Sequence, residues 1–226
     1  MTQQVDIIQN DPEVPAGVFA ELLAEWQVPM RTLRPDLGEP LPASAAAVIV
    51  LGGVMGVHDE AAHRFLRSVK EFIGRMLAGG TPLFGICLGG QLLADVAGGA
   101  VRSNCRGERG LVDVSLTAAG VSDPLFAGVD RRFPAFQWHN DSFTIPPAAV
   151  HLATSAACPG QAFRLGNAWG VQFHPEVDGA IVAAWSGRTA AQAQLIAEFT
   201  AAAAAHRALA RQLLNNFLAA AGMRGS

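Results

Sequence analysis

The segment Leu83-Phe-Gly-Ile-Cys87-Leu-Gly-Gly-Gln91 joins a short apolar run to a stretch with helical spacing, with a cysteine at the junction. The form Gly-x-Cys-x-Gly is that of a nucleophile elbow, a sharp strand-to-helix turn that lifts the middle side chain above a sheet. The free N–H groups and the dipole of the following helix favour a thiolate there. The segment therefore predicts a nucleophilic Cys87, and a small buried structural cysteine is the alternative.

The sequence around this segment alternates between strand and helix patterns. The run Ala45 to Leu51 is unbroken and rich in β-branched residues, which is typical of a strand buried on both faces of a parallel sheet. Strands are predicted at 5–8, 30–33, 45–51 and 83–86, and helices at 17–26, 61–77 and 90–97. This succession predicts a doubly wound α/β sheet, in which ligands gather at the carboxyl ends of the strands, where Cys87 stands.

The remainder of the chain changes pattern twice. From about Leu111 to Phe173, short alternating segments separated by Pro, Gly and Asp predict antiparallel strands. From about residue 178 the chain is Ala-rich, and 190–221 predicts one long or two short helices. The expected buried stripe of these helices is Leu195, Ile196, Phe199, Leu209, Leu213 and Leu214. We thus expect one α/β domain over residues 1–226, with a mostly parallel central sheet, flanking helices and an antiparallel extension.

Composition excludes several classes of function. Half of the residues are hydrophobic and 15% are charged, and the formal charge of -3 comes with no basic run, so nucleic acid is not an expected partner. The longest apolar run, 45–57, is too short to span a membrane, and no export signal is recognised, so we expect a cytoplasmic protein. The three cysteines have neither a disulfide framework nor metal-ligand spacing. Because the chemistry of a thiolate nucleophile needs neither, we expect no metal and no cofactor.

A second motif, Gly170-Val-Gln-Phe-His174-Pro-Glu176, ends another apolar run. In an extended segment His174 and Glu176 project to the same side, because side chains alternate with a period of two. Glu176 can then hold one nitrogen of His174 while the other faces Cys87, as in a nucleophile–base–acid triad. A histidine at a strand end beside a solvated glutamate is the alternative interpretation.

Together these motifs resemble the class I glutamine amidotransferases, whose nucleophile segment and terminal His-Pro-Glu are matched by GICLGGQ (85–91) and GVQFHPEV (170–177). The likeness covers nearly the whole chain and is strongest to a GMP-synthase-type amidotransferase domain standing alone. It implies a flavodoxin-like fold and a triad of Cys87, His174 and Glu176. It also implies an oxyanion hole formed by the amides of Gly53 and Leu88.

The resemblance further implies substrate-binding roles. Gly52 and Gln91 match substrate-binding positions of the family. The segment 137–141 resembles the loop whose backbone grips the amino-acid end of the substrate, here at His139, Asn140 and Asp141. The chain has Val54 and Gly90 where many members have proline and a larger side chain. The other cysteines and histidines, Cys105, Cys158, His63, His151 and His206, are interpreted as structural.

Three functions remain open at this point. The first is hydrolysis of the γ-carboxamide of glutamine through a γ-glutamyl thioester, with the ammonia passed to a separate synthase subunit, since no synthase domain or phosphate loop follows. The second is hydrolysis of a γ-glutamyl amide or peptide without a partner. The third is a non-catalytic binding or regulatory module. An ordinary α/β-hydrolase is disfavoured, because its acid precedes its histidine in chain order.

Overall fold

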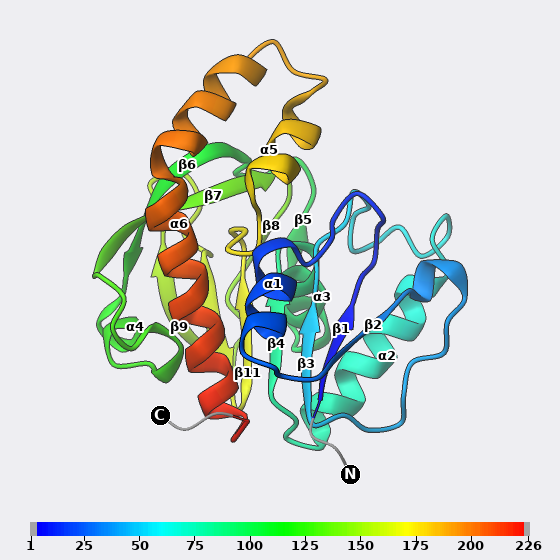
Figure 1. Ribbon diagram of the computed structural model, residues 1–226. Helices are drawn as coiled ribbons and strands as arrows, with labels where there is room; N and C mark the ends of the chain where they lie inside the picture. Colours follow the sequence, from blue (N-terminus) through cyan, green and yellow to red (C-terminus); the bar gives the residue numbers. More distant parts are fainter. Residues whose placement is uncertain (1–3, 224–226) are drawn as a thin grey trace.

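The computed structural model describes residues 4–223, and its centre is a nine-stranded sheet with the order β2-β1-β3-β4-β11-β10-β9-β6-β7 (Figure 1). The first five strands of this order run parallel. They are β1 (Val5–Ile8), β2 (Met30–Leu33), β3 (Ala47–Val50), β4 (Leu83–Ile86) and β11 (Ala168–Val171). Because they run parallel, the carboxyl ends of β3, β4 and β11 lie side by side along one edge of the sheet, the edge at which α/β folds bind ligands.

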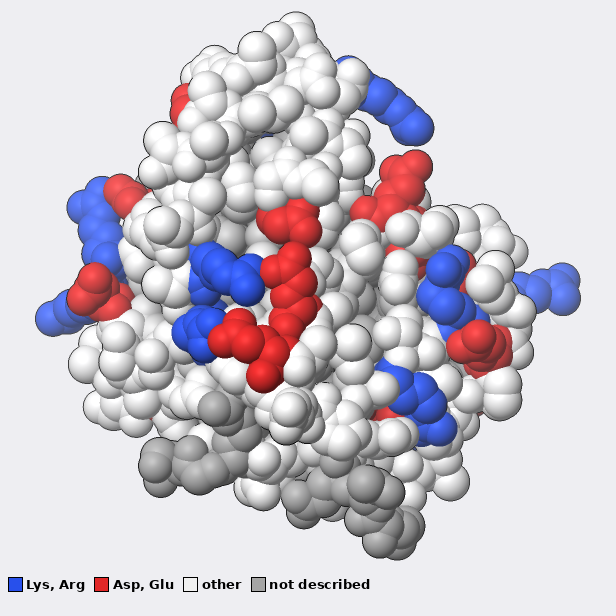
Figure 2. Space-filling view, viewed as in Figure 1, with Lys and Arg blue, Asp and Glu red and all other residues white. Residues whose placement is uncertain are grey.

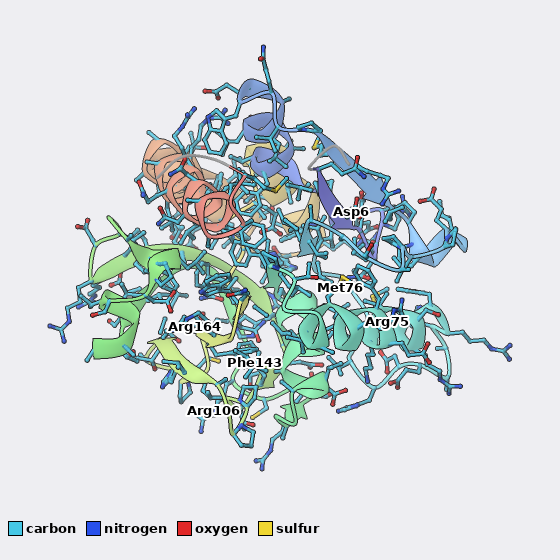
Figure 3. The ribbon with its side chains drawn as sticks, turned by 90° about the horizontal axis from the view of Figure 1, so that it is seen from below. Asp6, Arg75, Met76, Arg106, Phe143 and Arg164 are labelled. Atoms are coloured by element: carbon cyan, nitrogen blue, oxygen red, sulfur yellow. The ribbon has the colours of Figure 1, made fainter. Side chains whose placement is uncertain are left out.

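Helices cover both faces of this sheet (Figures 1 and 3). α1 (Gly17–Glu25) and α6 (Gln192–Ala220) lie on one face, and α2 (Phe65–Ala78) and α3 (Leu88–Val96) lie on the other. Side chains of one strand alternate between the two cores: Ile49 packs with α1 and α6, whereas Val48 and Val50 pack with α2 and α3. Met76, labelled in Figure 3, belongs to the α2 side. The predicted α/β class is confirmed.

The antiparallel extension is also confirmed, with one correction. β10 (Ala162–Leu165), β9 (Val150–Thr154), β6 (Glu108–Leu116) and β7 (Arg132–His139) pair antiparallel in that order. β11 lies in the stretch predicted to be antiparallel, yet it pairs parallel with β4, from Ala168 opposite Leu83 to Val171 opposite Ile86. A four-residue apolar run does not encode its partner, so its direction is set by tertiary pairing.

The remaining elements are short. β5 (Val101–Arg102) and β8 (Ser142–Phe143) form a separate two-stranded ladder. α4 (Ala118–Val121) and the 3-10 helices η1 (Pro35–Leu37) and η2 (Pro124–Phe126) are connections. α2 begins at Phe65 instead of the predicted residue 61, because the amides of Ala62 and His63 bond to the Asp59 carbonyl in a preceding turn.

The alanine-rich region forms α5 (Gly179–Ser186) and one continuous helix, α6. The expected stripe is buried at Phe199, Leu213 and Leu214, but Leu195, Ile196 and Leu209 are only partly buried. The first turns of α6 extend past the sheet edge together with α5, which explains the partial burial of Leu195 and Ile196 (Figure 1). Within residues 4–223, no helix is long and apolar enough to cross a bilayer.

Charged side chains bridge α6 and α1 at the surface. Arg207 pairs with Glu21, and Arg211 pairs with Glu25 at 2.7 Å, so that basic and acidic groups adjoin where the two helices cross (Figure 2). Exposed pairs of this kind contribute only about 0–1 kcal/mol each. The position of α6 is therefore fixed mainly by its buried residues, such as Leu213, Leu214 and Phe217.

Candidate active site

Cys87 occupies the turn between β4 and α3 with a backbone φ of +50°. This left-handed conformation is strained for a residue other than glycine, and such strain is typical of a nucleophile elbow. The flanking glycines are required for space: a Cβ at Gly85 would lie 2.5 Å from the Gly89 carbonyl oxygen, and one at Gly89 would lie 2.0 Å from that of Val50. The predicted elbow geometry is confirmed.

His174 and Glu176 follow β11 and are both buried. Nδ1 of His174 lies 2.7 Å from Oε1 of Glu176, and the His174 amide donates to the Phe136 carbonyl, which fixes the turn. Gly52 lies between His174 and Cys87: a Cβ there would be 3.2 Å from Cε1 of His174 and 3.6 Å from Cβ of Cys87. The three residues named from the motifs are therefore brought together.

The charge of His174 follows from these neighbours. Burial lowers the pKa of His174, but the negative charges of Glu176 and Cys87 outweigh burial and raise the pKa to about 10. At neutral pH the imidazole therefore keeps two protons, and Nδ1–H donates to Glu176. Nε2, on the other side of the ring, has no hydrogen bond to another residue of the described chain. This nitrogen is available to a group bound at Cys87.

Gly53 and Leu88 border the same cavity as Cys87. Asn10, fully buried, donates from Nδ2 to the Leu51 carbonyl at 2.8 Å and holds the end of β3. Gly53 lies close to Leu88: a Cβ on Gly53 would be 2.8 Å from Cδ2 of Leu88. Within residues 4–223, the Gly53 and Leu88 amides have no backbone carbonyl as a partner. Two free N–H groups beside a nucleophile can stabilise an oxyanion.

Gln91 lies one helical turn after Cys87 and borders the same cavity. Its Nε2 donates to the Asp141 carbonyl and to Oε1 of Gln172, both at 3.2 Å. Gln172 in turn points its Nε2 at the Cys87 sulfur, at 3.6 Å. Gln172 was not singled out from the sequence, although the same alternation that aligns His174 with Glu176 also aligns Gln172 with them.

The loop at the end of β7 borders the cavity, and its side chains bond to neighbouring segments of the protein. The His139 imidazole is buried, with Nδ1 2.9 Å from the Asp141 carbonyl and Nε2 3.3 Å from Glu108. Asn140 accepts from Arg109, and the Asp141 carboxylate accepts from the Asn104 amide. The His139 ring thus supports the loop from behind, and substrate binding by the loop backbone stays a prediction.

Several of the residues described above border one cavity of about 690 Å³. It is lined by Cys87, His174, Gly53, Leu88 and Gln91, and on its other walls by Arg109, Trp138, Ile181, Ala184 and Trp185. Gly52, expected to bind substrate, is buried and packs between His174 and Cys87. In Figure 1, α5 lies above the carboxyl ends of β4 and β11 and forms part of the roof.

Residues 22–181, more than two thirds of the chain, match the family described as "Glutamine amidotransferase class-I". This chain belongs to the class I glutamine amidotransferase family. Gly90, where the resemblance led us to expect a larger side chain, lies against β11: a Cβ there would be 2.6 Å from the Val171 carbonyl oxygen.

This chain spans most of some relatives and only a part of others. It is 31% identical over 180 residues to the glutamine amidotransferase-like protein YfeJ of Salmonella typhimurium, covering 76% of this chain and 75% of YfeJ. It is 38% identical to the GMP synthase [glutamine-hydrolyzing] of Aeropyrum pernix, covering 71% of this chain but only 28% of that enzyme. It is 31% identical to a γ-glutamyl-L-1-hydroxyisopropylamide hydrolase of a Pseudomonas species, covering 73% and 60%.

Solved structures agree with the family assignment. The crystal structure of a glutamine amidotransferase from Thermotoga maritima superposes with a TM-score of 0.89 at 27% identity, covering 96% of this chain and 99% of that one.

One buried group of this amidotransferase-family chain has the composition of a metal site. Ligand atoms of Glu108, His139 and Cys158 lie within 4.8 Å of one another. The Glu108 carboxylate, however, already accepts from Ser155 at 2.7 Å and from Gln161 at 2.6 Å. Burial raises the pKa of Cys158 to about 11, which keeps the sulfur protonated at neutral pH, whereas metal binding needs the thiolate. Glu108, His139 and Cys158 are therefore better explained as a hydrogen-bonded cluster that supports the loop at the end of β7 than as a metal site.

His206, interpreted from the sequence as structural, lies on α6 behind the site. Its ring packs edge-on against Phe199 with centroids 5.0 Å apart, and neither nitrogen has a hydrogen-bond partner in the described chain. Burial lowers the pKa of His206 to about 4, although Glu176 opposes the shift. The folded protein therefore keeps this ring neutral.

We expect His206 to make the protein acid-sensitive. The unfolded chain takes up a proton on His206 near pH 6.5, whereas the folded chain does so only near pH 4, so stability falls as pH drops through this window. Across the whole window, the protonation of His206 lowers the free energy of unfolding by about 3 kcal/mol. Urea unfolding at pH 7.5 and pH 4.5 should show a smaller acid loss for His206→Leu than for the wild type. His63→Leu is the control, and an equal acid loss in the wild type and His206→Leu would contradict the expectation.

Proposed function

We propose that this chain hydrolyses the γ-carboxamide of glutamine through a γ-glutamyl thioester on Cys87. The Cys87 sulfur attacks the carboxamide carbon, and the oxygen becomes an oxyanion held by the Gly53 and Leu88 amides. His174, protonated at rest by the Cys87 thiol proton and held by Glu176, gives the proton from Nε2 to the departing nitrogen. The C–N bond breaks, ammonia leaves, and the acyl group remains on sulfur.

The second half of the reaction, hydrolysis of the thioester, returns the enzyme to its starting state. His174, now neutral at Nε2, takes a proton from water, and the hydroxide formed attacks the thioester carbon. The C–S bond breaks, glutamate leaves, and the Cys87 thiolate faces a protonated His174 again. Gln172, which donates toward the sulfur, stabilises its negative charge at the beginning and end of the cycle.

The ammonia needs an acceptor. The chain spans about a quarter of the Aeropyrum GMP synthase, so the region of that enzyme beyond the match has no counterpart in these 226 residues. We propose that a separate synthase subunit receives the ammonia. Free thiols such as Cys87 persist in a reducing compartment, which supports a cytoplasmic location.

The observation that carries this proposal is the convergence of Cys87 and the His174–Glu176 pair in one cavity. Its test is covalent trapping with the diazoketone analogue of L-glutamine, followed by mass spectrometry, alongside glutamate release from L-glutamine. We expect one adduct per chain, on Cys87, with Cys105 and Cys158 unlabelled as internal controls. Absence of both label and glutamate release would contradict the proposal and favour the non-catalytic binding module.

A second candidate function is hydrolysis of a γ-glutamyl amide of a larger amine. The cavity of about 690 Å³ falls in the range of pockets that hold drug-sized ligands, and Ile181, Ala184 and Trp185 give it an apolar wall. The Pseudomonas relative is named for such a substrate. Rates with L-glutamine and γ-glutamyl dipeptides, measured side by side, separate the two candidates, because a higher kcat/KM for the dipeptides favours the second.

A further inference from the structure

Arg109 is a charged residue of the cavity wall that the proposed reaction does not use. It stands on β6 opposite Trp138 of β7, and its guanidinium carbon lies 4.8 Å from the centre of the Trp138 ring. Partial burial lowers the pKa of Arg109, and the charge of Cys87 opposes this shift. Arg109 and Cys87 line the same cavity.

The guanidinium is held in place, but not by an acid. Nη1 donates to the carbonyls of Glu108 and His139, and Nη2 donates to Oδ1 of Asn140 at 2.7 Å. Within the described chain no carboxylate lies within ion-pair distance of Arg109. Arg164, by contrast, forms an ion pair with Asp123. A fixed positive charge that borders a cavity and has no counter-charge is suited to an anionic ligand group.

Two of the five N–H donors of Arg109 remain, one on Nε and one on Nη2. These two nitrogens form the side-on edge with which arginine holds a carboxylate through two parallel hydrogen bonds. The Trp138 ring and the three acceptors restrict the motion of the side chain, so little rotamer entropy is left to lose on binding.

The position of Arg109 relative to the triad decides which end of a substrate it meets. The leaving nitrogen must lie at Nε2 of His174, and Trp185 of α5 packs against that imidazole with centroids 4.9 Å apart. Arg109 instead contacts the β7 loop through His139 and Asn140, and Gln91 of α3 contacts the same loop through Asp141. Arg109 therefore belongs to the acyl side of the cavity, away from the leaving group.

We propose that Arg109 binds the α-carboxylate of the γ-glutamyl substrate and so restricts this site to γ-glutamyl compounds with a free α-carboxylate. The inference rests on the proposed hydrolytic function. It makes Arg109 a specificity-determining residue, because a substrate whose α-carboxylate is amidated or in a peptide bond would leave the guanidinium without its counter-charge.

The test compares L-glutamine with L-glutaminamide, whose α-carboxylate is a neutral carboxamide, by ammonia release. Arg109→Met keeps the apolar stem and removes the charge, and it should lower kcat/KM for L-glutamine by about tenfold or more, mainly through KM. The rate with L-glutaminamide should stay within about twofold. Arg109→Lys, which keeps the charge without the fork, should be intermediate. Arg132→Met, at the other end of the β6–β7 pair, is the matched control.

Three outcomes would overturn the inference. Equal losses with both substrates in Arg109→Met would mean that the guanidinium acts on Cys87 or on the fold. A loss confined to γ-glutamylglycine, with γ-glutamylethylamide unaffected, would place Arg109 on the leaving-group side. Calorimetry should show that L-glutamine binds more weakly to the Cys87→Ala, Arg109→Met double variant than to Cys87→Ala alone. Unchanged binding would also overturn the inference. Arg109-dependent binding without any turnover in the wild type would instead reject the proposed function alone.

Discussion

Replacing Cys87 with serine is expected to lower glutamate release from L-glutamine at pH 7.5 by at least about 10⁴-fold, nearly as far as replacing it with alanine. The reason is the acidity of the nucleophile. The negative charge of Cys87 is one of the causes that raise the pKa of His174 to about 10 against the effect of burial. A serine hydroxyl is a far weaker acid than a thiol, so the Cys87→Ser variant lacks both the ionised nucleophile and its effect on His174.

The pH dependence of the two variants sharpens this expectation. Without the charge of Cys87, the pKa of His174 should be lower in both variants than in the wild type. A neutral His174 can accept a proton from the serine hydroxyl of Cys87→Ser, whereas Cys87→Ala has no proton to give. The steady-state rates of the two variants should therefore coincide at low pH and separate as pH rises. Cys105→Ser, at a partly exposed cysteine, controls for loss of a thiol as such. A Cys87→Ser rate within about 100-fold of the wild type at pH 7.5 would contradict the expectation, because the reaction would then not need a thiolate.

The core of the site could be predicted because its parts are encoded locally. The sharp strand-to-helix turn of the Gly-x-Cys-x-Gly motif leaves no room for a Cβ at its two glycines. The short distances from an added Cβ at Gly85 and Gly89 to backbone atoms show this in the structure. His174 and Glu176 lie two residues apart, so a short extended segment is enough to pair them. The parallel pairing that brings the ends of β4 and β11 to one edge was not predicted, because the direction of β11 is set by tertiary pairing.

The walls of the site could not be predicted in the same way, because they depend on contacts between distant segments. The orientation of His139 is set by Glu108, which the β6–β7 register places opposite it. Arg109 in an alternating strand looks like an ordinary solvent-facing residue until the same register sets it against Trp138 and the β7 loop. No local signal distinguishes it from Arg132, which pairs with Asp113 at the surface.

The roof was missed for a related reason. Trp185 lies on α5, a short apolar helix whose pattern predicts burial but not its neighbour. In the structure the indole packs against His174 and donates from Nε1 to the Glu13 carbonyl at 2.7 Å. That bond joins residues at nearly opposite ends of the chain. Hydrophobic periodicity predicts that a helix packs, whereas the surface it packs on follows from the fold as a whole.

Gly89→Ala is expected to destabilise the protein by more than about 3 kcal/mol or to prevent soluble expression. The added Cβ would lie 2.0 Å from the Val50 carbonyl oxygen and 3.1 Å from that of Leu51. Both obstacles are backbone atoms of β3 and the glycine loop, so no side chain can rotate away. Relief requires α3 to separate from β3, which would also move Cys87 and the Leu88 amide away from Gly53. Urea unfolding measures the loss, with glutamate release recorded on any folded fraction.

Gly74→Ala supplies the matched control, because the same methyl group is added where the structure leaves room. Gly74 lies in the middle of α2, and the nearest atom to its added Cβ is Cγ1 of Val96 at 3.8 Å, an ordinary contact. Alanine in a helix interior is favoured over glycine by about 0.5–1 kcal/mol, so this variant should be more stable than the wild type. The two substitutions should therefore shift stability in opposite directions. A Gly89→Ala protein within about 1 kcal/mol of the wild type would mean that the elbow tolerates a Cβ and that the close approach of α3 to β3 does not fix Cys87.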